Sequence, residues 1–296
     1  MKSLIKNNIF YKIAQLFYGE LFNRNNSIKT RFMRLACRTP IKTICYYVYK
    51  KIFKKENIQL EETDNFDQFE NIIDEKKILK DIKNTGLSLD INLKNEIVEK
   101  ILQKITDKKF QVNRDKNRFI IFSQKKDDDI YLYRLHNPHT FVSEIDELSR
   151  NKKILNIVRK YLNTEPIIHS SQIWWTFPYF DQHGKMINPP GNEYGFHYDV
   201  DDFKFLKLFF YLSDVDVKSG PHMYIINDGK KNFKEFLNRR IENNFAEDLY
   251  NNRIVTITGK KGSGFIEDTS FYHRGSNPLS NSGRGVLQII YSVSKW

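Results

Sequence analysis

The stretch Gly195-Phe196-His197-Tyr198-Asp199 is the part of the chain around which the predicted fold and site are organised. His197 and Asp199 are two residues apart, so their side chains leave the same face if this stretch is a β-strand. One imidazole beside one carboxylate supplies two of the three ligands of a 2-His-1-carboxylate facial triad, which suits non-haem Fe(II). The sequence therefore predicts a metal site here, with a third ligand arriving from elsewhere in the chain.

His273 is the candidate third ligand, within Phe271-Tyr272-His273-Arg274-Gly275. Arg284 then opens the last strong strand-like stretch, and an arginine beside a metal pocket suits bidentate binding of a carboxylate. Iron with three protein ligands keeps positions open for a co-substrate and O₂. Since a His-x-Asp tripeptide alone arises by chance in many chains, the prediction depends on this combination of residues.

The composition indicates a globular protein with a basic N-terminal part. The chain has 296 residues, of which 40% are hydrophobic and 14% aromatic, so it can bury a sizeable core. Of its net charge of +12, most lies in residues 1–56, which carry thirteen basic and two acidic side chains. Cys37 and Cys45 are too few for a disulfide framework, and we expect free thiols in a reducing cytosol.

We expect residues 1–62 to form a basic helical arm and linker, and residues 63–296 to form the main domain. Apolar residues recur at helical spacing among basic ones in 1–22 and 31–55, and 57–74 is acidic and rich in turn-forming residues. Such helices pack on the main domain, lie on an anionic membrane surface or bind nucleic acid. No signal peptide or run of about 18 apolar residues is present, so we expect a cytoplasmic protein, with membrane association left open.

The periodicity predicts an α+β, mainly β fold. Two helical stretches within 75–105 flank Gly86, and 143–161 is predicted to be helical, starting with a capping-box-like pattern at Ser143 and Asp146. A helical insertion is predicted over 231–250. Short strands are predicted at 119–122, 130–133, 167–177, 205–212, 223–226, 255–257, 264–266 and 286–291. Helices followed by short strands favour an antiparallel barrel with helical cover.

From about Leu79 to Tyr291 the chain resembles the phytanoyl-CoA dioxygenase family, which are Fe(II)- and 2-oxoglutarate-dependent oxygenases built on a double-stranded β-helix, a jelly-roll or cupin-like barrel. The matching pieces are the helix–Gly–strand–helix segment 79–102, the His197-x-Asp199 motif, 206–221, 264–268, and His273 with Arg284. The resemblance implies that His197, Asp199 and His273 hold the iron and that Arg284 pairs with the distal carboxylate of 2-oxoglutarate. The family usually has a Pro-Gly-Ser-His-type loop where this chain has 226–230, which puts substrate handling in question.

By that resemblance the protein would hydroxylate a C–H bond of a small-molecule or lipid-like substrate and release succinate and CO₂. The carboxylate of Asp199 favours hydroxylation over the halogenase variants that lack it. Two alternatives stay open: a nucleic-acid-directed dioxygenase that uses the basic arm, and a non-catalytic barrel that acts as a binding module. Nucleic acid is the less expected partner, because the arginine pattern of such enzymes differs from the single Arg284 here.

Three further residues are candidates for substrate binding. Gln172 and Trp174 lie on a predicted strand before the metal motif, where family members often line the pocket; the alternative is ordinary aromatic core. Lys207 interrupts an apolar strand, and a buried lysine needs a partner, so it meets an anionic group or reaches solvent. His222 is expected to be a turn or core residue and not a fourth ligand.

Overall fold

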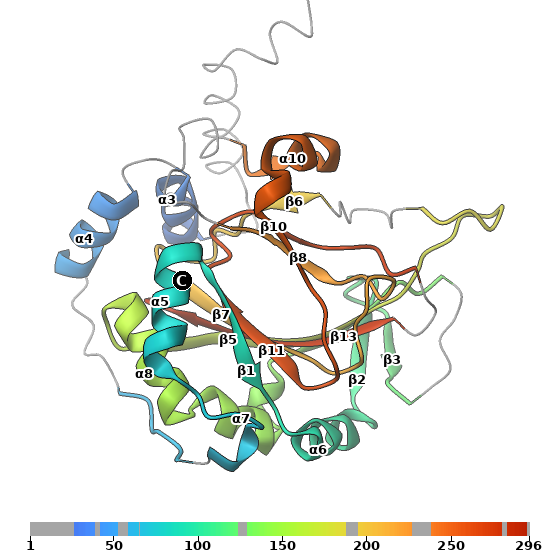
Figure 1. The fold of residues 1–296 in the computed structure, drawn as a ribbon, viewed down its shortest axis with the longest axis horizontal. Helices are drawn as coiled ribbons and strands as arrows, with labels where there is room; N and C mark the ends of the chain where they lie inside the picture. Colours follow the sequence, from blue (N-terminus) through green and yellow to red (C-terminus); the bar gives the residue numbers. More distant parts are fainter. Residues whose placement is uncertain are drawn as a thin grey trace, which may run out of the picture.

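The computed structural model describes residues 27–38, 42–52, 59–64, 66–123, 129–187, 195–226, 238–279 and 283–294, and these form two antiparallel sheets with helices (Figure 1). The larger sheet runs in the order β1 (Leu87–Asn92), β11 (Ser263–Glu267), β7 (Phe205–Tyr211), β13 (Arg284–Ser292), β5 (Ile167–Thr176), β4 (Leu132–His136), β2 (Lys109–Val112) and β3 (Phe119–Ile121). The smaller sheet runs in the order β10 (Ile254–Ile257), β8 (His222–Ile225), β12 (His273–Gly275), β6 (Phe196–His197) and β9 (Arg240–Ile241).

The chain alternates between the two sheets. It passes from β5 in the larger sheet to β6 in the smaller, back to β7, across to β8, and later from β11 to β12 to β13. Alternation of this kind is how a jelly roll closes two sheets around one interior. The arrangement is compatible with the double-stranded β-helix that the sequence predicts.

Strand β7 shows how the two faces of the larger sheet differ. Every residue of β7 is buried, including Lys207, as the mainly apolar run predicted. Leu208 and Phe210 point into a core shared with the helices, whereas Phe209 and Tyr211 point into the interior between the sheets. There they pack with Tyr224 of the smaller sheet. The metal site predicted from the sequence lies at the edge of this interior.

Helices cover the outer face of the larger sheet (Figure 1). They include α5 (Glu75–Thr85), α6 (Asn95–Ile105), α7 (Ser143–Ser149) and α8 (Lys152–Leu162). Gly86 ends α5 in the left-handed conformation with φ +81°, as predicted. The remaining helical elements are α3 (Ile28–Cys37), α4 (Lys42–Ile52), α10 (Asn243–Tyr250) and the short 3₁₀ turns Phe66–Gln68, Pro138–Thr140 and Asn251–Arg253.

The helical prediction over 143–161 is confirmed for most of its length, with one break. The segment divides into α7 and α8, because Asn151 caps α8 by accepting hydrogen bonds from the backbone N–H groups of Lys153 and Ile154. Ser143 does not cap α7, since the Ncap position falls on Val142 without a side-chain bond. The helical insertion over 231–250 was wrong in part: Arg240–Ile241 is strand β9, only 243–250 is an α-helix, and 231–237 lies outside the described residues.

The described part of the basic arm contacts the barrel. Helix α3 buries Met33, Ala36 and Cys37 in a cluster with Phe196 and Tyr198, which flank His197. This helix therefore packs on the main domain, one of the three roles considered for the arm. The predicted boundary between 1–62 and 63–296 stays a prediction, and the predicted helix over 1–22 lies outside the described residues. Within the described ranges, no helix has the length and hydropathy needed to cross a membrane.

Candidate metal centre

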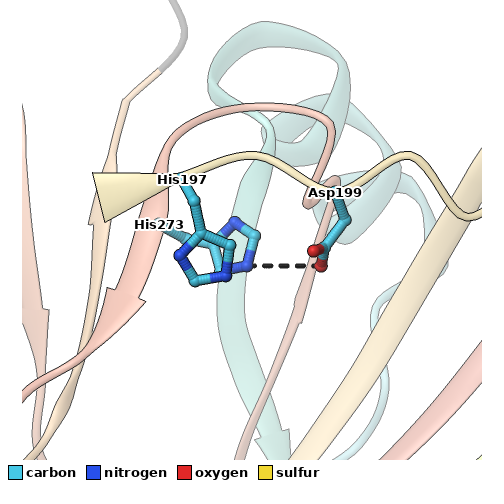
Figure 2. A group of neighbouring side chains, drawn as sticks. All are labelled: His197, Asp199 and His273. Carbon is cyan, nitrogen blue, oxygen red and sulfur yellow. Dashed lines mark ion pairs between the residues drawn. The ribbon is translucent and has the colours of Figure 1, made fainter. Parts of the chain in front are cut away.

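His197, Asp199 and His273 come together at the edge of the barrel interior (Figure 2). Strand β12 pairs with β6 so that His273 lies directly opposite His197. Asp199 lies just beyond the end of β6, and its backbone N–H donates to the carbonyl of Thr269 at 2.7 Å. One ligand atom from each of the three side chains lies within 4.8 Å of the other two. The sequence motif and the distant histidine therefore converge on one point.

Both imidazoles are oriented by backbone carbonyls. Nδ1 of His197 lies 3.1 Å from the oxygen of Gly195, and Nδ1 of His273 lies 2.9 Å from the oxygen of Phe271. A bond to a carbonyl requires a hydrogen on Nδ1, which leaves the lone pair on Nε2. Burial and the neighbouring His273 lower the pKa of His197 to about 3, so this ring is neutral at physiological pH. Each ring thus presents the nitrogen that a metal ion would use.

Asp199 is ionised. Burial alone would raise its pKa, but the ammonium of Lys207 and the imidazole of His273 together hold that pKa well below its usual value. Nε2 of His273 lies 3.3 Å from Oδ2 of Asp199, and this carboxylate outweighs the effect of burial and raises the pKa of His273. A metal ion binding here would therefore compete with a proton on His273.

Lys207 does have the anionic partner that its burial demands. Its Nζ lies 2.6 Å from Oδ2 of Asp199 and 2.7 Å from Oδ2 of Asp201. Although burial lowers the pKa of this lysine, the two carboxylates outweigh that effect and raise it, so the ammonium is charged. In the described residues Lys207 therefore pairs with Asp199, the candidate metal ligand. The role of Lys207 in substrate binding stays a prediction.

His222 and Glu267 support His273 from the barrel interior. The ring of His222 stacks on that of His273, with centroids 5.6 Å apart and an interplanar angle of 19°. Nε2 of His222 lies 3.0 Å from both carboxylate oxygens of the fully buried Glu267. His222 is a buried core residue, as the sequence indicated, and its contacts fix the ring that packs against a candidate ligand.

Arg284 is buried at the start of β13, on the strand where the sequence placed it. Its Nη1 donates to the carbonyl oxygen of Gly220 at 2.5 Å. Gly275 provides the space for the guanidinium, because a Cβ at that position would lie 2.6 Å from Nη2. Burial lowers the pKa of His222 most, and the nearby His273 and Arg284 lower it further. The guanidinium of Arg284 therefore lies close to His222, which packs on the candidate ligand His273.

Gln172 and Trp174 lie on the inner face of β5, whereas Ile173 between them lies on the outer face. Nε1 of Trp174 donates to Oε1 of Gln172 at 2.7 Å. Trp175 points to the opposite face, where its ring lies 5.1 Å from that of Phe122. The structure thus separates a polar pair inside the barrel from an ordinary core aromatic outside. Substrate contact by the pair stays a prediction.

Several residues around the site were not identified from the sequence. Arg239 lies with Nη2 4.0 Å from Oδ1 of Asp199, and no motif marks it. Asp201 could have been found, since it continues the alternation of Asp199 on the chain. Arg134 on β4 donates from Nε to Oε1 of Gln172 at 2.9 Å, and its place within an apolar strand was the available signal.

The donor set fits Fe(II). Two imidazole nitrogens and one ionised carboxylate, all within 4.8 Å, form the 2-His-1-carboxylate pattern, and the other nitrogen of each ring is already bonded. The three residues would occupy one side of the ion and leave its other side for further ligands. The ion pair with Lys207 keeps the carboxylate of Asp199 charged, and its ammonium competes with a metal ion for Oδ2.

The chain shares its fold with 2-oxoglutarate-dependent non-haem iron enzymes. EctD from S. alaskensis, solved with 2-oxoglutarate and 5-hydroxyectoine, superposes with a TM-score of 0.52 and 17% identity over 80% of this chain and 80% of its own. SnoN, a non-heme alpha ketoglutarate dependent epimerase from nogalamycin biosynthesis, superposes with a TM-score of 0.50 and 9% identity over 74% of this chain and 82% of its own. At sequence identities this low, the similarity shows a shared fold and nothing about function.

No protein-family model and no protein with a curated function matches this chain. The resemblance to the phytanoyl-CoA dioxygenase family therefore stays a prediction, while the wider group of oxygenase folds is supported by the superpositions.

Proposed function

We propose that this protein is an Fe(II)- and 2-oxoglutarate-dependent dioxygenase of the phytanoyl-CoA dioxygenase type. It hydroxylates a C–H bond of a small-molecule or lipid-like substrate, with release of succinate and CO₂. The observation that carries this proposal is the convergence of His197, Asp199 and His273, with their donor atoms within 4.8 Å. The shared fold with EctD and SnoN supports it, because EctD was solved with 2-oxoglutarate bound and SnoN is an alpha ketoglutarate dependent epimerase.

Each part of the proposed reaction has a residue of this chain assigned to it. His197, Asp199 and His273 hold the iron, and Arg284 binds the distal carboxylate of 2-oxoglutarate by charge-assisted hydrogen bonds. When bound, the iron and its co-substrate supply the oxidising chemistry with O₂. Lys207 and His273 keep Asp199 ionised, and His222 holds the ring of His273 in place. Phe209 and Phe265 pack against His222 and exclude water behind the site.

The direct test is metal binding followed by turnover. Anaerobic Fe(II) titration, and then succinate formation from 2-oxoglutarate, would be measured for the wild type and for the variants His197→Ala and Asp199→Asn. We expect both variants to lose metal affinity by more than about 100-fold. His169→Ala, which removes a histidine outside the triad, serves as the matched control and should bind iron as the wild type does.

The same assay separates the alternatives. A wild-type protein that binds neither iron nor 2-oxoglutarate would leave only the non-catalytic binding module. Succinate formation that rises with an alkylated oligonucleotide, and with none of the small molecules offered, would favour the nucleic-acid-directed enzyme.

We also propose peripheral contact of the arm with an anionic membrane surface. Helices α3 and α4 leave apolar side chains exposed at helical spacing: Ile28, Phe32, Ile44, Tyr47 and Val48. Basic residues lie among them, including Lys29, Arg31, Lys42 and Lys51. Exposed apolar groups combined with basic charge suit an interfacial helix.

Flotation with vesicles containing anionic lipid tests this contact. The double variant Phe32→Glu, Tyr47→Glu should stay with the unbound fraction, whereas Phe119→Glu, which changes an exposed aromatic residue far from the arm, should float as the wild type does. Equal flotation of all three proteins would remove the membrane proposal.

A further inference from the structure

Arg134 of β4 faces the interior of the barrel. In the larger sheet Arg134 lies opposite Trp174, and Trp174 lies opposite Val286. Side chains directly opposite each other in antiparallel strands share one face of the sheet. Val286 belongs to the cluster that packs with Tyr224 of the smaller sheet, so this face is the inner one. Arg134 is therefore on the same wall as Gln172 and Trp174.

The guanidinium is held in one orientation. Its Nε donates to Oε1 of Gln172 at 2.9 Å, and Nε1 of Trp174 donates to the same oxygen at 2.7 Å. Its central carbon lies 5.6 Å from the centre of the Trp174 ring. Two donors on Oε1 fix which way the Gln172 amide points, and the amide in turn fixes the arginine. Among the described residues, only one of the five N–H groups of Arg134 donates a hydrogen bond.

Arg134 is a partly buried cation without an anionic partner among the described residues. No carboxylate of the described part of the chain forms an ion pair with it, whereas Arg159, also partly buried, bonds to both Glu62 and Glu165. Burial, helped by the charge of Arg114, lowers the pKa of Arg134 to about 10, so it is still protonated at neutral pH. Taking a charge out of water without a partner is unfavourable, and an incoming anion would remove that cost.

We infer that Arg134, oriented by Gln172 and Trp174, binds an oxyanion, a carboxylate or phosphate group, carried by the substrate. The inference rests on the proposed function, since it assigns this group to the substrate of that enzyme. The two terminal nitrogens of Arg134 form the planar fork that matches two oxyanion oxygens. Arg284 is a separate cation, buried near Gly220 and Gly275. It is the residue proposed above to bind 2-oxoglutarate. The substrate class is therefore an anionic small molecule.

The test uses inorganic phosphate and acetate as probes, titrated by calorimetry into the full-length protein. We expect at least one of them to bind the wild type, and Arg134→Gln to weaken that binding by at least about tenfold. Arg134→Lys keeps the charge but not the planar fork, so its affinity for the anion should lie between those of the wild type and of Arg134→Gln. Arg114→Gln removes an equal charge nearby and should leave the affinity within about twofold. The comparison of phosphate with acetate decides which oxyanion the site takes.

The second readout separates this inference from the proposed function. Anaerobic binding of Fe(II) and of 2-oxoglutarate should be the same in Arg134→Gln as in the wild type, and circular dichroism should show the same fold. If neither probe binds, or if Arg134→Gln binds both as well as the wild type, the inference is wrong. It is equally wrong if the variant loses 2-oxoglutarate, because Arg134 would then serve the co-substrate. Failure of the wild type to bind iron would instead overturn the proposed function, while anion binding at Arg134 would still be measured.

Discussion

Nζ of Lys207 lies 2.6 Å from Oδ2 of Asp199, the carboxylate that the site offers to a metal ion. The lysine is on β7 of the larger sheet and the aspartate follows β6 of the smaller one, so this ion pair connects the two sheets at the candidate metal centre. The carboxylate is therefore charged and held in place before any metal arrives, and the ammonium competes with the ion for the same oxygen.

Replacement of Lys207 by methionine should have opposite effects on stability and on metal affinity. Without metal the variant should lose about 3 kcal/mol of unfolding free energy, because a buried carboxylate loses its closest partner. Metal should then bind more tightly, since the competing charge is gone. Denaturant unfolding in chelator and thermal shift with Co(II) measure the two effects. Lys260→Met, which breaks an exposed ion pair with Asp214, is the control and should change neither.

Gly275→Ala should weaken 2-oxoglutarate binding without affecting the metal. A Cβ at this position would lie 2.6 Å from Nη2 and 3.1 Å from Nη1 of Arg284, so the guanidinium must move. We expect the 2-oxoglutarate dissociation constant to rise by about tenfold or more, as for a bidentate bond that loses its geometry. Anaerobic titrations of metal and of co-substrate give the two constants. An unchanged 2-oxoglutarate affinity would contradict the assignment of Arg284.

Glu267→Ala should be strongly destabilising and Glu267→Gln should not. The alanine variant leaves a cavity and a buried His222 without its acceptor, which together cost about 2–4 kcal/mol. Glutamine keeps the shape and one acceptor oxygen, so the loss should be less than half as large. Urea unfolding of the two variants gives the comparison. Equal losses would show that the negative charge of Glu267, and not its hydrogen bond, stabilises this part of the barrel.

Cys37 should be unreactive and Cys45 reactive towards iodoacetamide at pH 8. Burial raises the pKa of Cys37 to about 12, so its thiolate is scarce at that pH, and the side chain lies in the cluster between α3 and β6. Cys45 is partly exposed. Mass spectrometry of the native protein should find the label on Cys45, and urea should make both cysteines reactive. Early labelling of Cys37 in the native protein would show that α3 does not stay packed on the barrel.

His136 should titrate below its ordinary range. Burial first, and the charge of Arg134 second, lower its pKa from 6.5. Because the folded state binds this proton more weakly than the unfolded state, the contribution of His136 to stability is complete above about pH 6.5 and is lost as the pH falls through the lowered value. NMR titration of the ring hydrogens, assigned with His136→Asn, should show this, and Arg134→Gln should move the pKa back towards 6.5. No change in that variant would argue against the closeness of the two side chains.

Much of the fold could be predicted because the relevant signals are local. The apolar run at 205–212, interrupted only by Lys207, predicted a strand buried on both faces, and Gly86 predicted a helix end, since both depend on neighbouring residues only. The break between α7 and α8 was missed because Asn151 accepts two backbone hydrogen bonds inside a continuous apolar pattern. Strand β9, only two residues long, exists through its pairing with β6, and no periodicity can reveal so short an element.

The sequence by itself determined which chemical groups the site can use: two histidines, one carboxylate two residues after the first of them, and an arginine later in the chain. Only the tertiary structure decided that His273 pairs opposite His197, that Lys207 bonds to Asp199, and that Arg134 joins Gln172 and Trp174 inside the barrel. The physical reason is that periodicity states which face of a strand a side chain takes, whereas the neighbour across the sheet depends on register and on the closure of two sheets around one interior.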